Sequence, residues 1–324
     1  MGSGAEQLPE IIVLGPPAVF EIYDEQFSSR FRILRPWESE EPLPHFLASR
    51  AHTTLAALCS GGYPLSAAVL ANLPSLRLVV TTSAGLDHID LTECRRRGIA
   101  VAYAGNFFSA DVADLAVGLL VDVLRKMTAG NRFVKNGLWP HKPHFPLGFK
   151  LGGKRVGIVG LGSIGLEVAK RLEAFGCAIS YHSRKEKPFV SYTSYPDIHE
   201  LASNCDVLVL CCSLTEQTHQ MVNREVMLAL GKDGVIVNIS RGAVIDEKEL
   251  VSCLLQGEIA GAGLDVFEHE PRPSPELYQL DNVVLSPHTA VLTEESMEGL
   301  YQLICGNLDA FFTDKPLLSQ VPDE

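Results

Sequence analysis

The sequence predicts an α/β fold of two domains, each with helices packed on a parallel sheet. The chain has 324 residues, which exceeds the usual size of one domain. Its residues are 46% hydrophobic and 20% charged, as is ordinary for globular proteins. Short apolar runs alternate with helical segments along two successive stretches of the chain, and this rhythm is typical of parallel α/β sheets.

The first series of strands occupies the N-terminal third of the chain. We expect strands in IIVLG, FRIL, TLAALCS, LRLVVTTSAG and IAVAYA, at 11–15, 31–34, 54–60, 76–85 and 99–104. A helix should follow over 109–127, capped by Ser109, because apolar residues recur there at helical spacing. Residues 136–153 are rich in Pro and Gly and predict a loop.

The second series begins at Lys154, and its strands are apolar on both faces. They are RVGIVG, CAISYHS, CDVLVLCC, GVIVNIS, AGAGLDV and NVVLSPH. Such strands are typical of a doubly wound parallel sheet that is covered by helices on each side. A last helix is expected over 293–315.

Charge and composition argue against several classes of partner. The formal net charge is −12, which disfavours non-specific binding to nucleic acid or to an anionic membrane. No apolar run reaches transmembrane length, and the N-terminal MGSGAEQLPE lacks the pattern of a secretory signal. The eight cysteines show no metal-binding spacing, and half of them lie in apolar strand-like runs, as reduced thiols do. We therefore expect a cytosolic protein with no metal, membrane or nucleic-acid partner.

The segment GIVGLGSIGLEVAKRL holds Gly160, Gly162 and Gly165 between a predicted strand and a predicted helix. In this context the first glycine permits a tight turn, and the second lets the backbone approach a pyrophosphate. The third allows close packing of the helix on the strand. A glycine-rich packing turn in another kind of α/β protein is the alternative, but the flanking elements favour dinucleotide binding.

The strand after this turn ends in YHSRKEK, which places Ser183, Arg184 and Lys185 at its end. Dinucleotide-binding folds usually have Asp or Glu here to bind the ribose hydroxyls, whereas Arg suits a 2′-phosphate. No carboxylate occurs from Cys177 to Lys185. The sequence therefore predicts NADP(H), with a solvated charged surface as the alternative.

Three later strands run into residues that can carry chemistry. GVIVNIS leads to Arg241, AGAGLDV to Glu270 and NVVLSP to His288. Ligands bind at the carboxyl edge of such sheets, so we expect these three side chains at the same edge as the glycine turn. A guanidinium can bind a carboxylate through two hydrogen bonds, a histidine can transfer a proton near neutral pH, and a nearby carboxylate orients it. Beside a nicotinamide, this set fits hydride transfer to the carbonyl of a 2-oxo acid.

Other polar residues are interpreted as structural. Asp246 and Glu249 in IDEKEL predict a helix start of the capping-box type. His182, His219 and His269 have no matching partners in the sequence and are interpreted as surface or core histidines.

The motifs GIVGLGSIG, NISRGAVIDEKEL, AGLDVFEHEP and NVVLSPH together resemble the D-isomer-specific 2-hydroxyacid dehydrogenase family. Within it, YHSRKEKP, LTEQTHQMV and FSADVADLAVGLL are similar to plant-type NADPH-dependent hydroxypyruvate/glyoxylate reductases. The resemblance implies two Rossmann-like domains. A doubly wound dinucleotide-binding domain at 106–289 would be inserted into a smaller, flavodoxin-like substrate domain formed by 1–105 and 290–324. It also implies a homodimer formed through the cofactor domains, and NADPH as cofactor with NADH as the weaker alternative.

The resemblance also assigns roles to single residues. Arg241 would hold the carboxylate and carbonyl of the substrate, and Glu270 would support His288, the proton donor. Substrate would further contact Ser83, Ala84 and Gly85. The cofactor would contact Gly160, Leu161, Gly162, Ser163, Ile164, Gly165, Ser183, Arg184, Lys185, Ile239, Ser240, Arg241 and Asp265. Two departures stand out: TAVLTEE follows His288 where the family more often has a Gly-Ser turn, and Ser163 replaces an Arg found in many relatives.

The expected activity is the NADPH-dependent reduction of glyoxylate or hydroxypyruvate to the 2-hydroxy acid. One alternative is a reductase of aromatic 2-oxo acids such as hydroxyphenylpyruvate. The other is a nucleotide-sensing binding protein, similar to the corepressors that share this scaffold.

Overall fold

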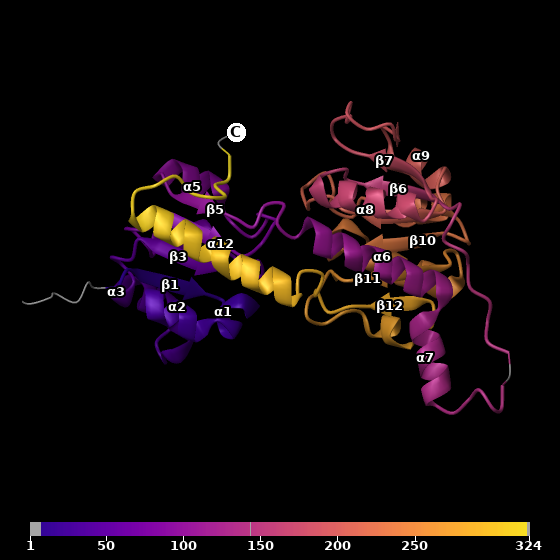
Figure 1. Ribbon diagram of the computed structural model, residues 1–324, viewed down its shortest axis with the longest axis horizontal. Coiled ribbons are helices and arrows are strands. Elements are labelled where there is room, and N and C mark those ends of the chain that lie inside the picture. The colour runs from indigo at the N-terminus through magenta and orange to yellow at the C-terminus, as the bar shows by residue number, and fades with distance from the viewer. Residues whose placement is uncertain (1–7, 143, 323–324) are drawn as a thin grey trace, which may run out of the picture. The chain divides into compact units, whose positions relative to one another are not determined.

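The computed structural model describes residues 8–142 and 144–322, which fall into two compact units (Figure 1). One unit contains the chain up to Phe108 and again from Leu292, and the other is Ser109–Val291. The boundaries expected from the sequence, 105/106 and 289/290, lie two to three residues before these. The first seven residues, which include most of the segment examined for a secretory signal, lie outside the described residues.

The smaller unit is built on a five-stranded sheet with the order β2-β1-β3-β4-β5 and parallel pairing throughout. Its strands are β1 (Glu10–Leu14), β2 (Arg32–Leu34), β3 (Ala56–Cys59), β4 (Leu78–Thr81) and β5 (Ala100–Ala102). Its helices are α1 (Ala18–Ile22), α2 (Asp24–Arg30), η1 (Pro36–Glu38), α3 (Leu43–Arg50), α4 (Ala67–Ala71), α5 (Leu91–Arg97) and α12 (Glu294–Phe312). The strand order 2-1-3-4-5 is that of flavodoxin-like sheets, as predicted.

The C-terminal helix α12 belongs to this unit because its buried face packs on the N-terminal part of the chain (Figure 1). The ring of Tyr301 in α12 stacks on Tyr23 with 4.8 Å between ring centroids, and it meets Phe27 edge-on at 5.0 Å. Ile304 and Leu308 continue the same buried stripe. Packing between helices thus joins segments that are far apart in sequence.

The larger unit is built on a seven-stranded parallel sheet with the order β12-β11-β10-β9-β6-β7-β8. Its strands are β6 (Arg155–Val159), β7 (Ala178–His182), β8 (Thr193–Ser194), β9 (Val207–Leu210), β10 (Val235–Asn238), β11 (Gly261–Leu264) and β12 (Val283–Leu285). Its helices are α6 (Ser109–Arg125), α7 (Met127–Lys135), α8 (Ser163–Ala174), α9 (Ile198–Ser203), α10 (Arg224–Leu230), η2 (Gly242–Val244), α11 (Glu247–Gln256) and η3 (Pro275–Gln279). Counted from β6, the order places strands 3-2-1-4-5-6 side by side, as in dinucleotide-binding doubly wound sheets.

Helices cover both faces of the larger sheet, and β11 shows how the faces are divided. Ala262 and Leu264 point into the core formed with α9, α10 and α11. A Cβ at Gly261 or Gly263 would lie within 3.0 Å of side chains of α6, so these glycines let α6 approach the opposite face closely. In AGAGL, the alanine and leucine side chains therefore pack on one face of the sheet, and the glycines allow α6 to pack closely on the other face.

Two local predictions need correction. The helix expected over 109–127 ends at Arg125, because Lys126 adopts a left-handed conformation (φ 54°), and the separate helix α7 follows. Ser109 is the first residue of α6 rather than its cap, and its hydroxyl has no hydrogen-bond partner among the described residues.

The predicted capping box is only half formed. Asp246 caps α11 by accepting the amide hydrogen of Glu249 at 3.1 Å. The Glu249 carboxylate, however, accepts from Arg224 at 3.2 Å instead of the Asp246 amide, which donates to the carbonyl of Val222.

The three glycines of the turn after β6 meet different demands. Gly160 has a φ of +95°, and a Cβ there would lie 2.7 Å from the backbone of Cys212. A Cβ at Gly165, in the first turn of α8, would lie 2.4 Å from the carbonyl oxygen of Gly160. Gly162 caps α8 and has nothing within 4 Å of its Cβ position, so its backbone remains accessible. Packing therefore requires the first and third glycines, whereas the second leaves open space.

We expect Gly165→Ala to destabilise the larger unit by roughly 1–3 kcal/mol, because the added methyl group overlaps a backbone atom that cannot move freely. Gly162→Ala is the matched control and should change the free energy of unfolding by less than about 0.5 kcal/mol. Thermal unfolding of both purified variants measures the difference. Equal unfolding temperatures would show that α8 can move away from β6 without a loss of stability.

Candidate active site

The candidate site lies at the carboxyl edge of the larger sheet, where β10, β11 and β12 are parallel neighbours. The chain reaches Arg241 three residues after β10 ends at Asn238. Glu270 lies in the segment after β11, and His288 follows β12. The sheet thus brings the segments of all three predicted side chains to one edge.

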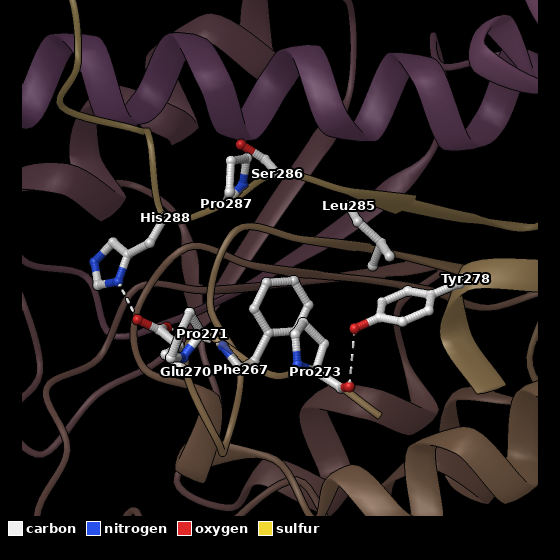
Figure 2. A pocket seen from close by; sticks show the side chains of 9 residues that line it. All are labelled: Phe267, Glu270, Pro271, Pro273, Tyr278, Leu285, Ser286, Pro287 and His288. Carbon is white, nitrogen blue, oxygen red and sulfur yellow. Dashed lines mark hydrogen bonds and ion pairs between the residues drawn. The ribbon is translucent and has the colours of Figure 1, made fainter. Parts of the chain in front are cut away.

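Glu270 and His288 form the central pair of the site (Figure 2). Glu270 Oε2 lies 2.7 Å from His288 Nδ1, and its other oxygen accepts the amide hydrogen of Phe267 at 3.1 Å. Both side chains are partly exposed, at 36% for Glu270 and 46% for His288. With Nδ1 bonded to the carboxylate, Nε2 is the ring nitrogen that remains for a substrate.

Opposing influences act on the Glu270 carboxyl. Burial by itself would raise its pKa. The hydrogen bond and charge of His288, the Phe267 amide and the charge of Arg241 outweigh burial and hold the pKa of Glu270 below its ordinary value. Glu270 is therefore an anion across the neutral range, which is the state that can orient and stabilise an imidazolium.

A buried aspartate holds the backbone that carries His288. Asp265 is 1% exposed, and its two carboxylate oxygens accept the amide hydrogens of Thr289 and Ala290 at 2.8 and 3.1 Å. Its carbonyl oxygen accepts the amide hydrogen of His288 at 2.8 Å. These bonds fix a backbone in which His288 has the uncommon φ of 54°. The contact expected between Asp265 and a cofactor stays a prediction.

Arg241 follows a short buried segment, in which Ile239 and Ser240 are 6% and 8% exposed. The fully buried Asn238 accepts from the Ser240 amide and hydroxyl at 3.0 and 2.9 Å and donates to the Arg241 carbonyl at 3.0 Å. Arg241 Nη1 in turn donates to the Ser240 carbonyl at 2.8 Å. The backbone from which the guanidinium extends is therefore firmly held.

A cavity of about 240 Å³ lies beside the Glu270–His288 pair (Figure 2). It is lined by Phe267, Glu270, Pro271, Pro273, Tyr278, Leu285, Ser286, Pro287 and His288. In Figure 2 the His288 ring stands at one end, and its second nitrogen is directed away from the apolar side chains. The apolar wall thus backs the pair on the side opposite to Nε2.

A second cavity, of about 190 Å³, lies beside the glycine turn. It is lined by Val159, Gly160, Leu161, Gly162, His182, Ser183, Arg184, Lys187, Cys211, Cys212, Ser213, Thr215, Thr218 and Met221. These residues include two cations and no carboxylate, so they fit an anionic dinucleotide with a phosphate near the end of β7. This cavity contains Ser183 and Arg184, but its lysine is Lys187 rather than the predicted Lys185.

The placement of Lys187 depends on a contact that the sequence does not reveal. The Tyr181 side chain is 1% exposed, and its hydroxyl accepts the Lys187 amide hydrogen at 2.8 Å, which curls the loop after β7 back onto the strand. His182, interpreted above as a surface or core histidine, also lines the cavity and has its Nδ1 3.0 Å from the Tyr195 carbonyl oxygen.

The predicted substrate residues Ser83, Ala84 and Gly85 belong to the smaller unit, just after β4. The Ser83 amide donates to the Thr81 hydroxyl at 3.3 Å, and the Ser83 carbonyl accepts from the Ala104 amide at 3.1 Å. This loop is therefore anchored to both β4 and the segment after β5. Its contact with a substrate stays a prediction.

Within 8–142 and 144–322, no group of three or more His, Cys, Asp or Glu side chains is placed to hold a metal ion. No helix in this part of the chain has the length and apolar character needed to cross a membrane.

Comparisons with known proteins agree with this geometry. A family model described as the NAD binding domain of D-isomer specific 2-hydroxyacid dehydrogenases matches residues 117–290. A glyoxylate/hydroxypyruvate reductase of Arabidopsis thaliana is 54% identical over 314 residues, which cover 97% of each chain. A hydroxyphenylpyruvate reductase of Plectranthus scutellarioides is 45% identical over 298 residues, or 92% of this chain and 95% of that one.

A solved structure shows a similar fold along nearly the whole chain. The NADPH-dependent glyoxylate/hydroxypyruvate reductase of Sinorhizobium meliloti, in complex with NADP and malonate, has a TM-score of 0.89 and 34% identity. The match covers 97% of this chain and 96% of that one. From the family model and the extended identity to these relatives, the chain belongs to the D-isomer-specific 2-hydroxyacid dehydrogenase family.

Proposed function

We propose that the protein reduces glyoxylate or hydroxypyruvate to the corresponding 2-hydroxy acid with NADPH. The observation that carries this proposal is the 2.7 Å contact between Glu270 and His288 at the sheet edge that also holds Arg241 and the glycine turn. Relatives with 54% and 34% identity are reductases of these two acids.

In this reaction the bound nicotinamide supplies the hydride. His288 donates the proton from Nε2 to the oxygen that was the substrate carbonyl, while Glu270 stabilises the imidazolium through Nδ1. Arg241 binds the substrate carboxylate through its planar guanidinium. Amides of Ser83, Ala84 and Gly85 are proposed as further contacts to that carboxylate.

The choice of NADPH is supported by the cavity beside the glycine turn. Its cations, Arg184 and Lys187, stand at the end of β7, where a carboxylate would otherwise favour NADH. Ser183 adds a hydroxyl donor in the same cavity. NADH is the weaker alternative, since it lacks the phosphate that these groups would bind.

A second substrate class has a specific observation in its favour. The Plectranthus scutellarioides relative reduces hydroxyphenylpyruvate and is 45% identical to this chain. The aromatic acid shares the carboxylate and carbonyl that Arg241 and His288 would contact, so the two classes differ only in the room left for the side chain. A substrate panel distinguishes them, and a corepressor-like binding protein would reduce none of its members.

We further propose a cytosolic homodimer formed through the larger units. Support comes from α7 and the following loop, where Met127, Val134, Trp139 and Leu147 are 57%, 54%, 62% and 92% exposed. Exposed apolar side chains in such numbers are typical of an interaction surface. All eight cysteines are free, as is usual in the reducing cytosol.

We expect wild-type protein to oxidise NADPH with glyoxylate or hydroxypyruvate and His288→Ala to lose about 10²–10⁴-fold in kcat, because it lacks the proton donor. His269→Ala, next to Glu270 in sequence but not among the residues that line the cavity, is the control and should keep near-native turnover. NADPH affinity, measured by fluorescence titration, should differ little between the variants. A His288→Ala enzyme with wild-type turnover would exclude His288 as the donor.

We expect Glu270→Gln to move the pH profile of reduction to lower pH. Reduction uses the protonated imidazole, and the ionised Glu270, whose pKa is lowered, favours that form in the wild type. The neutral amide removes this support, so the alkaline limb of the profile should move to lower pH. Measuring kcat/KM for the 2-oxo acid from pH 5 to 9 tests this. An unshifted alkaline limb would remove Glu270 from the mechanism.

We expect Arg184→Ala to weaken NADPH binding about 10- to 150-fold and to leave NADH binding nearly unchanged, because a charge-assisted hydrogen bond contributes roughly 1.5–3 kcal/mol. Lys185→Ala and Lys187→Ala, two positions apart in the sequence, form a matched pair. Equilibrium dissociation constants for both cofactors show which lysine meets the phosphate. Equal losses with NADPH and NADH would mean that these cations are merely a solvated surface.

A further inference from the structure

One buried carboxylate in the larger unit has no part in the steps above. Glu247 is the first residue of α11 and is only 6% exposed. Its Oε2 accepts the Glu268 amide hydrogen at 2.9 Å, and its Oε1 accepts from the Ser274 amide at 3.2 Å and hydroxyl at 2.6 Å. Glu268 and Ser274 bracket the segment that contains Glu270.

Capping of α11 does not explain these contacts. Asp246 already caps the helix by accepting from the Glu249 amide at 3.1 Å. A buried carboxylate destabilises the fold unless its oxygens accept hydrogen bonds, and the Glu247 carboxylate accepts them from Glu268 and Ser274 of the 268–274 segment. The position of this carboxylate is therefore coupled to that segment and not to the helix start.

Other contacts hold the same segment from both sides. A Cβ at Gly242, directly after Arg241, would lie 2.1 Å from the carbonyl oxygen of Phe267, so the two backbones touch. On the cavity side, the Tyr278 hydroxyl donates to the Pro273 carbonyl at 3.2 Å (Figure 2). Because Glu247 also bonds to this segment, the segment cannot shift without breaking its contacts with Glu247, Gly242 or Tyr278.

We infer that Glu247 is a positioning residue for the proposed reduction: it holds the 268–274 segment so that Glu270 stays in contact with His288. The inference rests on the proposed function. Between its two anchored ends, the segment sets where the Glu270 carboxylate lies. The contact with His288 is 2.7 Å, and a displacement of about 1 Å would take it outside hydrogen-bond distance. Glu247 thereby acts on His288 only through Glu270.

The charged side chains next to the pair include Arg241 and Asp265. Arg241 faces Glu270 and lowers its pKa, and the Asp265 carboxylate is engaged by the Thr289 and Ala290 amides. Glu247 itself bonds to Glu268 and Ser274 and to neither member of the pair. A change in pH dependence on substitution of Glu247 would therefore report a moved Glu270, not the loss of a direct charge interaction.

The test compares Glu247→Ala and Glu247→Gln with the control Asp246→Ala, which weakens the same helix start without touching the segment. Hydrogen–deuterium exchange measures protection of the Glu268 and Ser274 amides, and it does not depend on activity. The pH profile of kcat/KM with NADPH and glyoxylate or hydroxypyruvate measures the Glu270–His288 contact. The profile is also measured for Glu247→Ala combined with Glu270→Gln.

We expect Glu247→Ala to lose at least about tenfold in protection of both amides and to shift the profile to lower pH, in the direction of Glu270→Gln. Glu247→Gln, which keeps one acceptor oxygen, should fall between it and the wild type. In the Glu270→Gln background the Ala substitution should add no further shift, because both act through one contact. Asp246→Ala should lower the unfolding temperature and leave the profile in place.

Three results would overturn the inference: unchanged protection in Glu247→Ala, an unchanged profile despite lost protection, or a further shift in the combined variant. A profile that moves equally in Asp246→Ala would show a general effect of helix loosening and would overturn it as well. Failure of the proposed function appears differently, since the wild-type protein would then reduce neither acid while the exchange measurement still reports on Glu247.

Discussion

The site depends on one constraint: loops that leave the carboxyl edge of a parallel sheet carry backbone amides that no strand satisfies. In the larger unit, two buried carboxylates accept these amide hydrogens. Asp265 holds the amides of Thr289 and Ala290 behind His288, and Glu247 holds those of Glu268 and Ser274 around Glu270. Asp265 directly follows strand β11, and Glu247 is the first residue of helix α11. The loops that these carboxylates bind are therefore held in place by the sheet and its helices. The 2.7 Å contact between Glu270 and His288 is the product of these two anchors.

Most of the fold could be predicted because its signals are local. Strands that are apolar on both faces can only be buried in a covered parallel sheet, and each of the eleven quoted runs contains an observed strand. The helix α7 could not be predicted, because MTAGNRFVK has few apolar residues and its pairing with Phe145, 5.3 Å from the Phe133 ring, comes from the following loop. Neither Gly nor Pro marks the break at Lys126, where the Leu124 carbonyl accepts the amide hydrogen of the distant Phe149 at 2.7 Å.

The grouping of the three proposed catalytic residues at one sheet edge was predictable for a different reason. Arg241, Glu270 and His288 each follow a recognisable strand, and parallel strands end at one edge, so sequence order alone brings them together. The lysine beside the glycine turn was not predictable in this way. Distance along the chain favours Lys185, but the bond from the Lys187 amide to the buried Tyr181 hydroxyl bends the loop and places Lys187 in the cavity. The path of a loop that is set by one buried side chain cannot be predicted from the spacing of residues in the sequence.

The same limit explains why Glu247 escapes notice in the sequence. In IDEKEL a carboxylate in the first turn of a helix is adequately explained by capping or by the helix dipole. Its partners lie more than twenty positions away, in a segment whose path is not periodic.

The three carboxylates of this edge differ in how far they are exposed to solvent. Glu270, at 36% exposure, has a lowered pKa and can respond to a proton on His288. Asp265 and Glu247, at 1% and 6%, have amide hydrogens on both oxygens and serve as fixed acceptors. Glu270 can therefore stabilise the charge that forms on His288, whereas the two buried carboxylates hold backbone amides in place.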